Sequence, residues 1–107
     1  MTDWEIKKGL LKQYDFRCAY CGFDFLASPS HFGAMTWDHL RSVKDGGTDE
    51  GNLVPACFFC NTVLKGKSSF NTVVECKEEL ARRREAFLNT WEYYDMRKAY
   101  RSKENKA

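Results

Sequence analysis

Residues 57–66 read CFFCNTVLKG, and an earlier stretch, residues 18–22, reads CAYCG. Together they carry two Cys-x-x-Cys pairs: Cys18, Cys21, Cys57 and Cys60. Zinc prefers four thiolate or imidazole ligands in a tetrahedron, and a two-residue gap lets both sulfurs of one pair reach one ion. The two stretches therefore predict a structural zinc ion that holds the base of a loop formed by residues 22–56.

The length of 107 residues is the usual size of a single domain. With 43% hydrophobic residues the chain can form a core, but a core this small often needs a metal, a disulfide or a partner. Binding of a structural zinc ion contributes about 10–16 kcal/mol and would supply folding energy that the core lacks. We expect one domain over residues 1–107.

The sequence also indicates a cellular compartment, which bears on how the cysteines are used. The start, MTDWEIKKGL, lacks the apolar segment of a signal peptide, and no stretch approaches the roughly 18 apolar residues of a membrane span. We therefore expect a cytoplasmic protein that does not enter the membrane. Paired cysteines in a reducing compartment more often bind metal than form disulfides, although buried free thiols or a redox pair are the alternative. Cys76, which has no paired cysteine nearby, is expected to be a buried apolar residue.

Apolar residues at helical spacing predict two helical regions outside the cysteine stretches. The first covers residues 4–14. The second is a C-terminal extension of about 70–101, in which one long amphipathic helix or two joined helices fit the pattern, with Ser69 or Asn71 as the N-cap.

Between the cysteine pairs, residues 35–40 and 52–55 are rich in strand-forming side chains and flank a turn signal. We expect two short strands, the second ended by Pro55, followed by a short helix over residues 58–65 that Gly66 terminates. Its two phenylalanines, Phe58 and Phe59, are expected to pack the core.

Residues 18–66 resemble the HNH endonuclease family. The motifs that carry this resemblance are Trp37-Asp38-His39-Leu40, Gly46-Gly47, Asn52-Leu53-Val54-Pro55, Cys57-Phe58-Phe59-Cys60-Asn61 and Lys65-Gly66. The resemblance implies an α+β fold: a ββα-metal (His-Me finger) core with a four-cysteine zinc site, flanked by an N-terminal helix and a long C-terminal helix. The family's signature positions fall on His39, Asn52 and Asn61. The third position is asparagine instead of histidine, so the chain is similar to the H-N-N variant.

The same residues suit phosphodiester hydrolysis, which needs an activated water and stabilisation of charge on the phosphoryl group. The ordinary pKa of a histidine side chain is about 6.5, so His39 is a candidate general base. Asp38 and Asn61 offer hard oxygens suited to one Mg²⁺ or Mn²⁺ ion. Asn52 would fix the loop or orient His39 by a hydrogen bond.

Asp38 and His39 are adjacent, and side chains of a regular strand alternate between its faces. Both can serve one site only if the strand ends or bulges there, and we expect such an irregularity.

Basic residues suggest where DNA phosphates could bind. Residues 1–62 have 6 Lys and Arg against 8 Asp and Glu, whereas residues 63–107 have 11 against 7. The candidate phosphate contacts are Arg41, Lys65, Arg97, Lys98 and Arg101. Lys65 could instead be a solvated lysine at a helix end. The run of Arg82, Arg83 and Arg84 is expected to lie on a solvated helix face and to pair with nearby glutamates.

Together these features predict a metal-dependent DNA endonuclease that works as a monomer and nicks one strand of a duplex with low or short sequence specificity. A noncatalytic zinc-knuckle module that binds nucleic acid is the alternative from another class. A further possibility is a nuclease that is active only with a phage or restriction partner protein.

Overall fold

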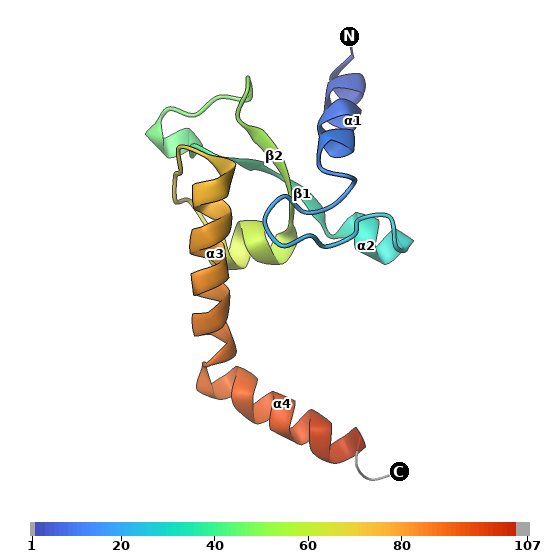
Figure 1. Ribbon diagram of the computed structural model, residues 1–107, viewed down its shortest axis with the longest axis vertical. Helices are drawn as coiled ribbons and strands as arrows, with labels where there is room; N and C mark the ends of the chain where they lie inside the picture. The colour runs from blue at the N-terminus through green and yellow to red at the C-terminus, as the bar shows by residue number, and fades with distance from the viewer. Residues whose placement is uncertain (1, 105–107) are drawn as a thin grey trace.

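The computed structural model describes residues 2–104 and has a mixed α+β fold (Figure 1). In chain order its elements are α1 (Asp3–Gln13), α2 (Pro29–Gly33), β1 (Met35–His39), the 3₁₀ turn η1 (Val43–Asp45), β2 (Leu53–Cys57), the π-helical segment η2 (Phe59–Lys65), α3 (Val73–Leu88) and α4 (Trp91–Glu104). Within the described part of the chain, no helix has both the length and the apolar character needed to cross a membrane.

The N-terminal helix α1 forms where the sequence places it. Thr2 caps it: its hydroxyl accepts a hydrogen bond from the backbone N–H of Glu5 at 3.2 Å, and the Glu5 carboxylate accepts from the N–H of Thr2 at 3.4 Å. This reciprocal capping box satisfies two N–H groups that the first turn leaves free. The helix ends at Gln13, and the chain then reverses through Asp15 and Phe16, both with positive φ.

Strands β1 and β2 form a two-stranded antiparallel sheet, with Met35 opposite Cys57 and His39 opposite Leu53. The expectation that Pro55 ends the second strand is wrong, because β2 continues through it to Cys57. The carbonyl of Pro55 accepts from Ala19 at 2.9 Å, so this residue directs its backbone polar groups away from β1. A proline here costs no hydrogen bond of the ladder.

The helix expected after β2 is present, but it is the π-helical segment η2. The N–H of Gly66 donates to the carbonyl of Asn61 at 2.9 Å, and Gly66 has a φ of 59°, which a side chain would disfavour. Gly66 thus ends the helix as predicted. Phe59 packs edge-on against Phe87, whereas Phe58 is exposed and does not join the core.

The C-terminal region is two helices, α3 and α4, and not one long helix. The N-cap of α3 is Thr72, whose hydroxyl accepts from Glu75 at 3.1 Å, instead of Asn71 or Ser69. At the other end of α3, the backbone N–H groups of Asn89 and Thr90 donate to carbonyls of its last turn. The Thr90 hydroxyl also donates to the Phe87 carbonyl. These local bonds end α3 without a proline. Figure 1 shows α4 projecting away from the rest of the protein.

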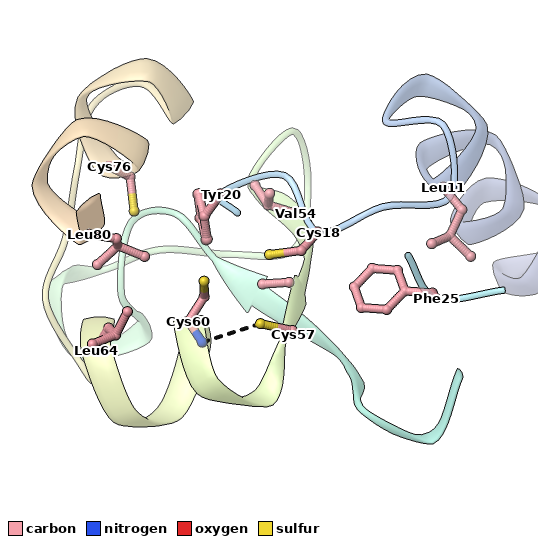
Figure 2. Packing of buried hydrophobic residues seen from close by; sticks show 11 residues of the cluster. Leu11, Cys18, Tyr20, Phe25, Val54, Cys57, Cys60, Leu64, Cys76 and Leu80 are labelled. Carbon is pink, nitrogen blue, oxygen red and sulfur yellow. Dashed lines mark hydrogen bonds between the residues drawn. The ribbon is translucent and has the colours of Figure 1, made fainter. Parts of the chain in front are cut away.

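The buried core includes three of the four paired cysteines (Figure 2), whereas Cys21 is exposed. Its members are Leu11, Cys18, Tyr20, Phe25, Val54, Ala56, Cys57, Cys60, Leu64, Cys76 and Leu80. Cys76 is fully buried beside Leu80 on α3, which confirms the prediction for the fifth cysteine. Because α1, β2, η2 and α3 all contribute to this one cluster, Cys18, Cys57 and Cys60 lie at the centre of the fold.

Candidate functional site

The four paired cysteines converge. Their sulfur atoms all lie within 4.8 Å of one another, and the Sγ atoms of Cys21 and Cys57 are 3.7 Å apart. Bonds of about 2.3 Å to a tetrahedral zinc ion would place sulfurs about 3.8 Å apart. The cysteines are thus positioned to bind one metal ion, as the sequence predicts, and four sulfur ligands suit zinc.

The sulfur atoms of this cluster perturb one another. Hydrogen bonds with the neighbouring thiols, above all Cys18, and then burial raise the pKa of Cys60. Arg84 on α3 adds a positive charge: its Nη2 donates to Cys60 Sγ at 2.9 Å, and its guanidinium lies 5.1 Å from the centre of the Phe59 ring. No pattern in the sequence indicated this contact.

Arg83 is also not on the solvated face that the sequence suggests. It is half-buried, and its Nη1 donates to the carbonyls of Leu64 and Lys65 and to the hydroxyl of Ser68. Arg83 does pair with Glu79 at 3.3 Å, as expected, but only Arg82 matches the whole expectation, as an exposed side chain paired with Glu79 at 2.9 Å. The triplet therefore mainly joins α3 to η2 and to the cysteine cluster.

Asp38 on β1 is buried, with a side chain 4% exposed. The hydroxyl of Tyr20 donates to its Oδ2 at 2.6 Å, and the ammonium of Lys65 lies 3.2 Å from its Oδ1. Burial raises the pKa of Asp38, and the Tyr20 hydroxyl and the Lys65 charge counter part of that rise. The carboxylate is therefore held by one residue from the first cysteine stretch and one from η2.

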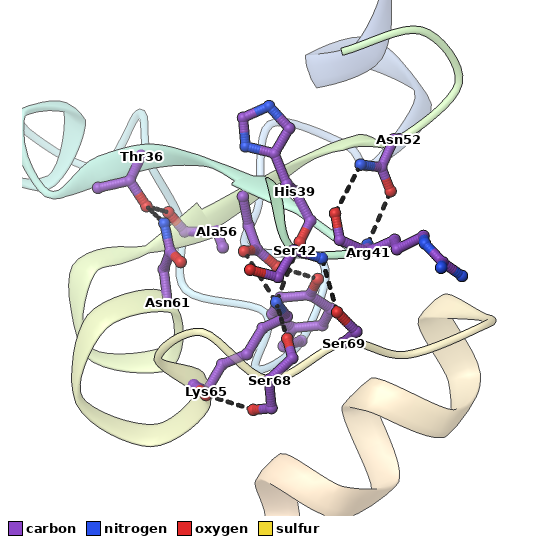
Figure 3. A network of polar contacts seen from close by, with 12 residues as sticks. Thr36, His39, Arg41, Ser42, Asn52, Ala56, Asn61, Lys65, Ser68 and Ser69 are labelled. Carbon is purple, nitrogen blue, oxygen red and sulfur yellow. Dashed lines mark hydrogen bonds and ion pairs between the residues drawn. The ribbon is translucent and has the colours of Figure 1, made fainter. Parts of the chain in front are cut away.

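Lys65 was expected either to contact phosphate or to be solvated at a helix end, and its environment contradicts both interpretations. Its side chain is only 1% exposed, so it is neither a solvated helix end nor free to contact phosphate. Besides Asp38, its ammonium donates to the carbonyls of His39 at 3.0 Å and Ser68 at 2.7 Å. These three oxygens use the three donors of the ammonium (Figure 3).

His39 lies on the other side of β1 from Lys65 (Figure 3). Of the two irregularities expected at Asp38 and His39, a strand end or a bulge, the structure has the first: β1 is paired without a bulge through His39 and ends there. The His39 ring is 30% exposed, and its Nε2 lies 2.6 Å from Oδ1 of Asp49. Asp49 was not among the predicted site residues, because nothing in the sequence shows how the loop between the strands folds back.

Asn52 holds that loop. Its Oδ1 accepts from the N–H of Arg41 at 2.8 Å, and its Nδ2 donates to the carbonyls of Arg41 at 2.9 Å and Thr48 at 2.8 Å. Gly47 packs so closely that an added Cβ would lie 1.9 Å from the Arg41 carbonyl oxygen. Of the two roles expected for Asn52, its contacts match the first, fixing the loop, while the ring of His39 is paired with Asp49.

Asn61 sits on η2 beside β1. Its Nδ2 donates to the Thr36 hydroxyl at 2.9 Å, and Thr36 donates in turn to the carbonyl of Ala56 at 2.7 Å. Asn61 lines a pocket of about 460 Å³ together with Asp38, His39 and Lys65. Three of the four residues expected at the site therefore border one pocket, whereas Asn52 acts from the loop beside it.

Residues 18–66 match the model of the family described as HNH endonuclease. This matched segment is similar to the HNH endonuclease family, and we call it the HNH domain. It makes up just under half of the chain and includes the cysteine cluster, both strands and η2. The family's description indicates a nuclease that acts on nucleic acid. Searches of curated proteins and of solved structures found no match to this chain.

The other candidate DNA contacts lie inside and outside the HNH domain. Arg41, inside it, is exposed, and its Nε donates to the Asp45 carbonyl at 2.9 Å. Three more are exposed on α4, beyond the HNH domain: Arg97, Lys98 and Arg101. A hollow of about 520 Å³ on α4 includes Arg97 and Arg101 but shares no residue with the pocket beside Asp38. The catalytic candidates and the basic helix are thus separate surfaces.

Proposed function

We propose that this protein is a metal-dependent DNA endonuclease that nicks one strand of a duplex. The observation that carries the proposal is the pocket shared by Asp38, His39 and Asn61 inside the HNH domain. A pure zinc-knuckle binding module has no chemical need for a carboxylate, an imidazole and an amide around one pocket. That reasoning favours the nuclease over the noncatalytic alternative.

Asp38 and Asn61 are the residues that would hold one Mg²⁺ or Mn²⁺ ion. A carboxylate has about four acceptor positions, of which Tyr20 and Lys65 use two in Asp38. Because the amide nitrogen of Asn61 is bonded to Thr36, its oxygen is the atom left for a ligand. These hard oxygens fit the ion's preference, and when bound it supplies charge stabilisation to the phosphoryl and leaving oxygens.

His39 would act as the general base. A hydrogen bond from Nε2 to the Asp49 carboxylate keeps the ring proton on Nε2 and leaves Nδ1 free to accept a proton from the attacking water. Asn52 and Gly47 would keep the loop that carries Asp49 in place. A partly exposed ring suits this role, since the water and the phosphate must both reach it.

DNA affinity would come from exposed cations that contact phosphates: Arg41, Arg97, Lys98 and Arg101. Phosphate contacts position a protein on DNA without reading its sequence, so we propose low or short sequence specificity. One site in each chain cuts one strand, and we propose that a monomer is the active unit. A requirement for a phage or restriction partner is the competing form of this proposal.

The test is to incubate zinc-loaded protein with supercoiled plasmid and either Mn²⁺ or Mg²⁺. We expect an open-circular product, and we expect His39→Ala to slow its formation by about 10²–10⁴-fold, the usual contribution of a general base. His31→Ala, which removes the chain's other histidine, is the matched control and should cut normally. DNA binding without open-circular product under either metal would reject the nuclease in favour of the binding module. Cleavage that appears only with an added partner would support the competing form.

A further inference from the structure

We infer that Tyr20 positions the Asp38 carboxylate for the divalent ion, and so makes the nuclease site depend on the cysteine cluster. This inference rests on the proposed function. It starts from the location of Tyr20 between Cys18 and Cys21, in the turn that would bind zinc. Tyr20 and Cys18 emerge from the same loop beside the other sulfurs (Figure 2).

The contact between Tyr20 and Asp38 is short and buried. The hydroxyl donates to Asp38 Oδ2 at 2.6 Å, and Tyr20 is 4% exposed. Hydrogen bonds to an ionised acceptor are about twice as strong as those between neutral groups, and water does not compete at a buried contact. The hydroxyl therefore fixes the rotation of the carboxylate while leaving other lone pairs for a ligand.

The turn that carries Tyr20 is itself anchored in two ways. The N–H of Ala19 donates to the Pro55 carbonyl at 2.9 Å, which ties the turn to β2. A metal ion bound by Cys18 and Cys21 would fix both ends of the turn, and the same ion would join it to Cys57 at the end of β2 and Cys60 in η2. Through Tyr20, order at the sulfur cluster is thereby transmitted to a carboxylate on β1.

Tyr20 is on this basis a positioning residue, since it acts on the ion through Asp38. Loss of an outer hydrogen-bond partner of a metal ligand typically costs 10–100-fold in metal affinity. Tyr20→Phe keeps the ring and its packing and removes only the hydroxyl. We expect it to weaken Mn²⁺ binding by about 10–100-fold, with the nicking rate at saturating Mn²⁺ much less affected.

Mn²⁺ binding is measured by electron paramagnetic resonance on zinc-loaded protein, beside the Mn²⁺ dependence of nicking. Tyr14→Phe, a half-buried tyrosine at the end of α1, is the matched control and should bind as the parent does. A purely structural Tyr20 would lower the melting temperature or the zinc content without shifting the Mn²⁺ midpoint. An unshifted midpoint in Tyr20→Phe overturns the inference and leaves the nuclease proposal intact.

A second measurement uses the parent protein and so does not depend on the variant folding. Titration with Mg²⁺ is followed by the NMR signals of the tyrosine rings, and we expect the Tyr20 signals to shift while those of Tyr14 stay in place. Tyr20 signals that do not move when Mg²⁺ supports cleavage overturn the inference. Absence of both Mn²⁺ binding and cleavage in the parent overturns the metal-dependent nuclease proposal, and the inference with it.

Discussion

The ammonium of Lys65 lies 3.2 Å from the carboxylate of Asp38, and both side chains are almost completely buried. Each charge has further partners, Tyr20 for Asp38 and two backbone carbonyls for Lys65. Burying two charges costs desolvation energy that their attraction only repays with such additional bonds. The pair therefore fixes η2 against β1, and it places a positive charge next to the oxygens proposed to bind a divalent ion.

Removing one charge of this pair should destabilise the fold. Lys65→Met keeps the length of the side chain but leaves Asp38 without its opposite charge, and we expect a loss of about 3–5 kcal/mol in the free energy of unfolding. Urea unfolding of zinc-loaded protein measures it. Lys67→Met, an exposed neighbour, should change the value by less than about 0.5 kcal/mol. Equal stability of the two variants would mean that the buried pair contributes nothing.

The contact between His39 and Asp49 makes a separate prediction about activity. Asp49→Asn removes the carboxylate that faces Nε2 of His39, so the ring should lose its preferred orientation and tautomer. Asp49 is largely exposed, so nicking should slow less than in His39→Ala, with folding unaffected. Glu50→Gln makes the same chemical change one residue further on and should leave the rate unchanged. A normal rate in Asp49→Asn would show that another group orients the ring.

The cysteine cluster predicts how metal and stability are linked. Cys57→Ser should lower the zinc content from one ion per chain and destabilise the fold, because binding energy at this cluster is folding energy. Cys76→Ala, which alters the buried cysteine outside the cluster, should keep one zinc ion. Metal analysis and thermal melting together check this. Full zinc content and an unchanged melting temperature in Cys57→Ser would reject the assignment.

The exposed cations of α4 predict the salt dependence of DNA binding. Reversing two of them, with Arg97→Glu and Arg101→Glu, should weaken binding and reduce the slope of log affinity against log salt by about 2, close to 0.9 for each lost phosphate contact. Lys8→Glu with Lys12→Glu changes the net charge equally on α1 and should have a smaller effect. If both double variants lose the same affinity, net charge and not α4 governs binding.

The fifth cysteine predicts a pH dependence of stability. Burial raises the pKa of the Cys76 thiol from 9.0 to about 11 in the folded protein. Because the folded state favours the protonated thiol, its stabilising effect is complete below pH 9 and is lost as the pH rises through 11. The free energy of unfolding of the parent should therefore fall more steeply over this range than that of Cys76→Ala. Parallel curves would contradict the raised pKa.

The spacing of residues along the sequence predicted several local features of the fold. Two Cys-x-x-Cys pairs indicated one metal site, and the four sulfurs do converge. Apolar periodicity located α1, and Gly66 marked the end of η2. These predictions succeeded because each depends on residues that are close in sequence, where chain geometry leaves few choices. The extent of β2 was misjudged, since whether Pro55 ends a strand depends on which side of it the partner strand lies.

The sequence by itself determined which chemical groups the site has: four thiols, the adjacent Asp38 and His39, and the amides of Asn52 and Asn61. Only the tertiary structure decided how these groups are used. In the folded protein Lys65 is buried against Asp38, and Tyr20 donates a hydrogen bond to the same carboxylate. His39 lies on the other face of β1 beside Asp49. Arg83 and Arg84 contact η2 and the cysteine cluster. The physical reason is that a side chain's partners and burial depend on segments that approach only when the chain has folded.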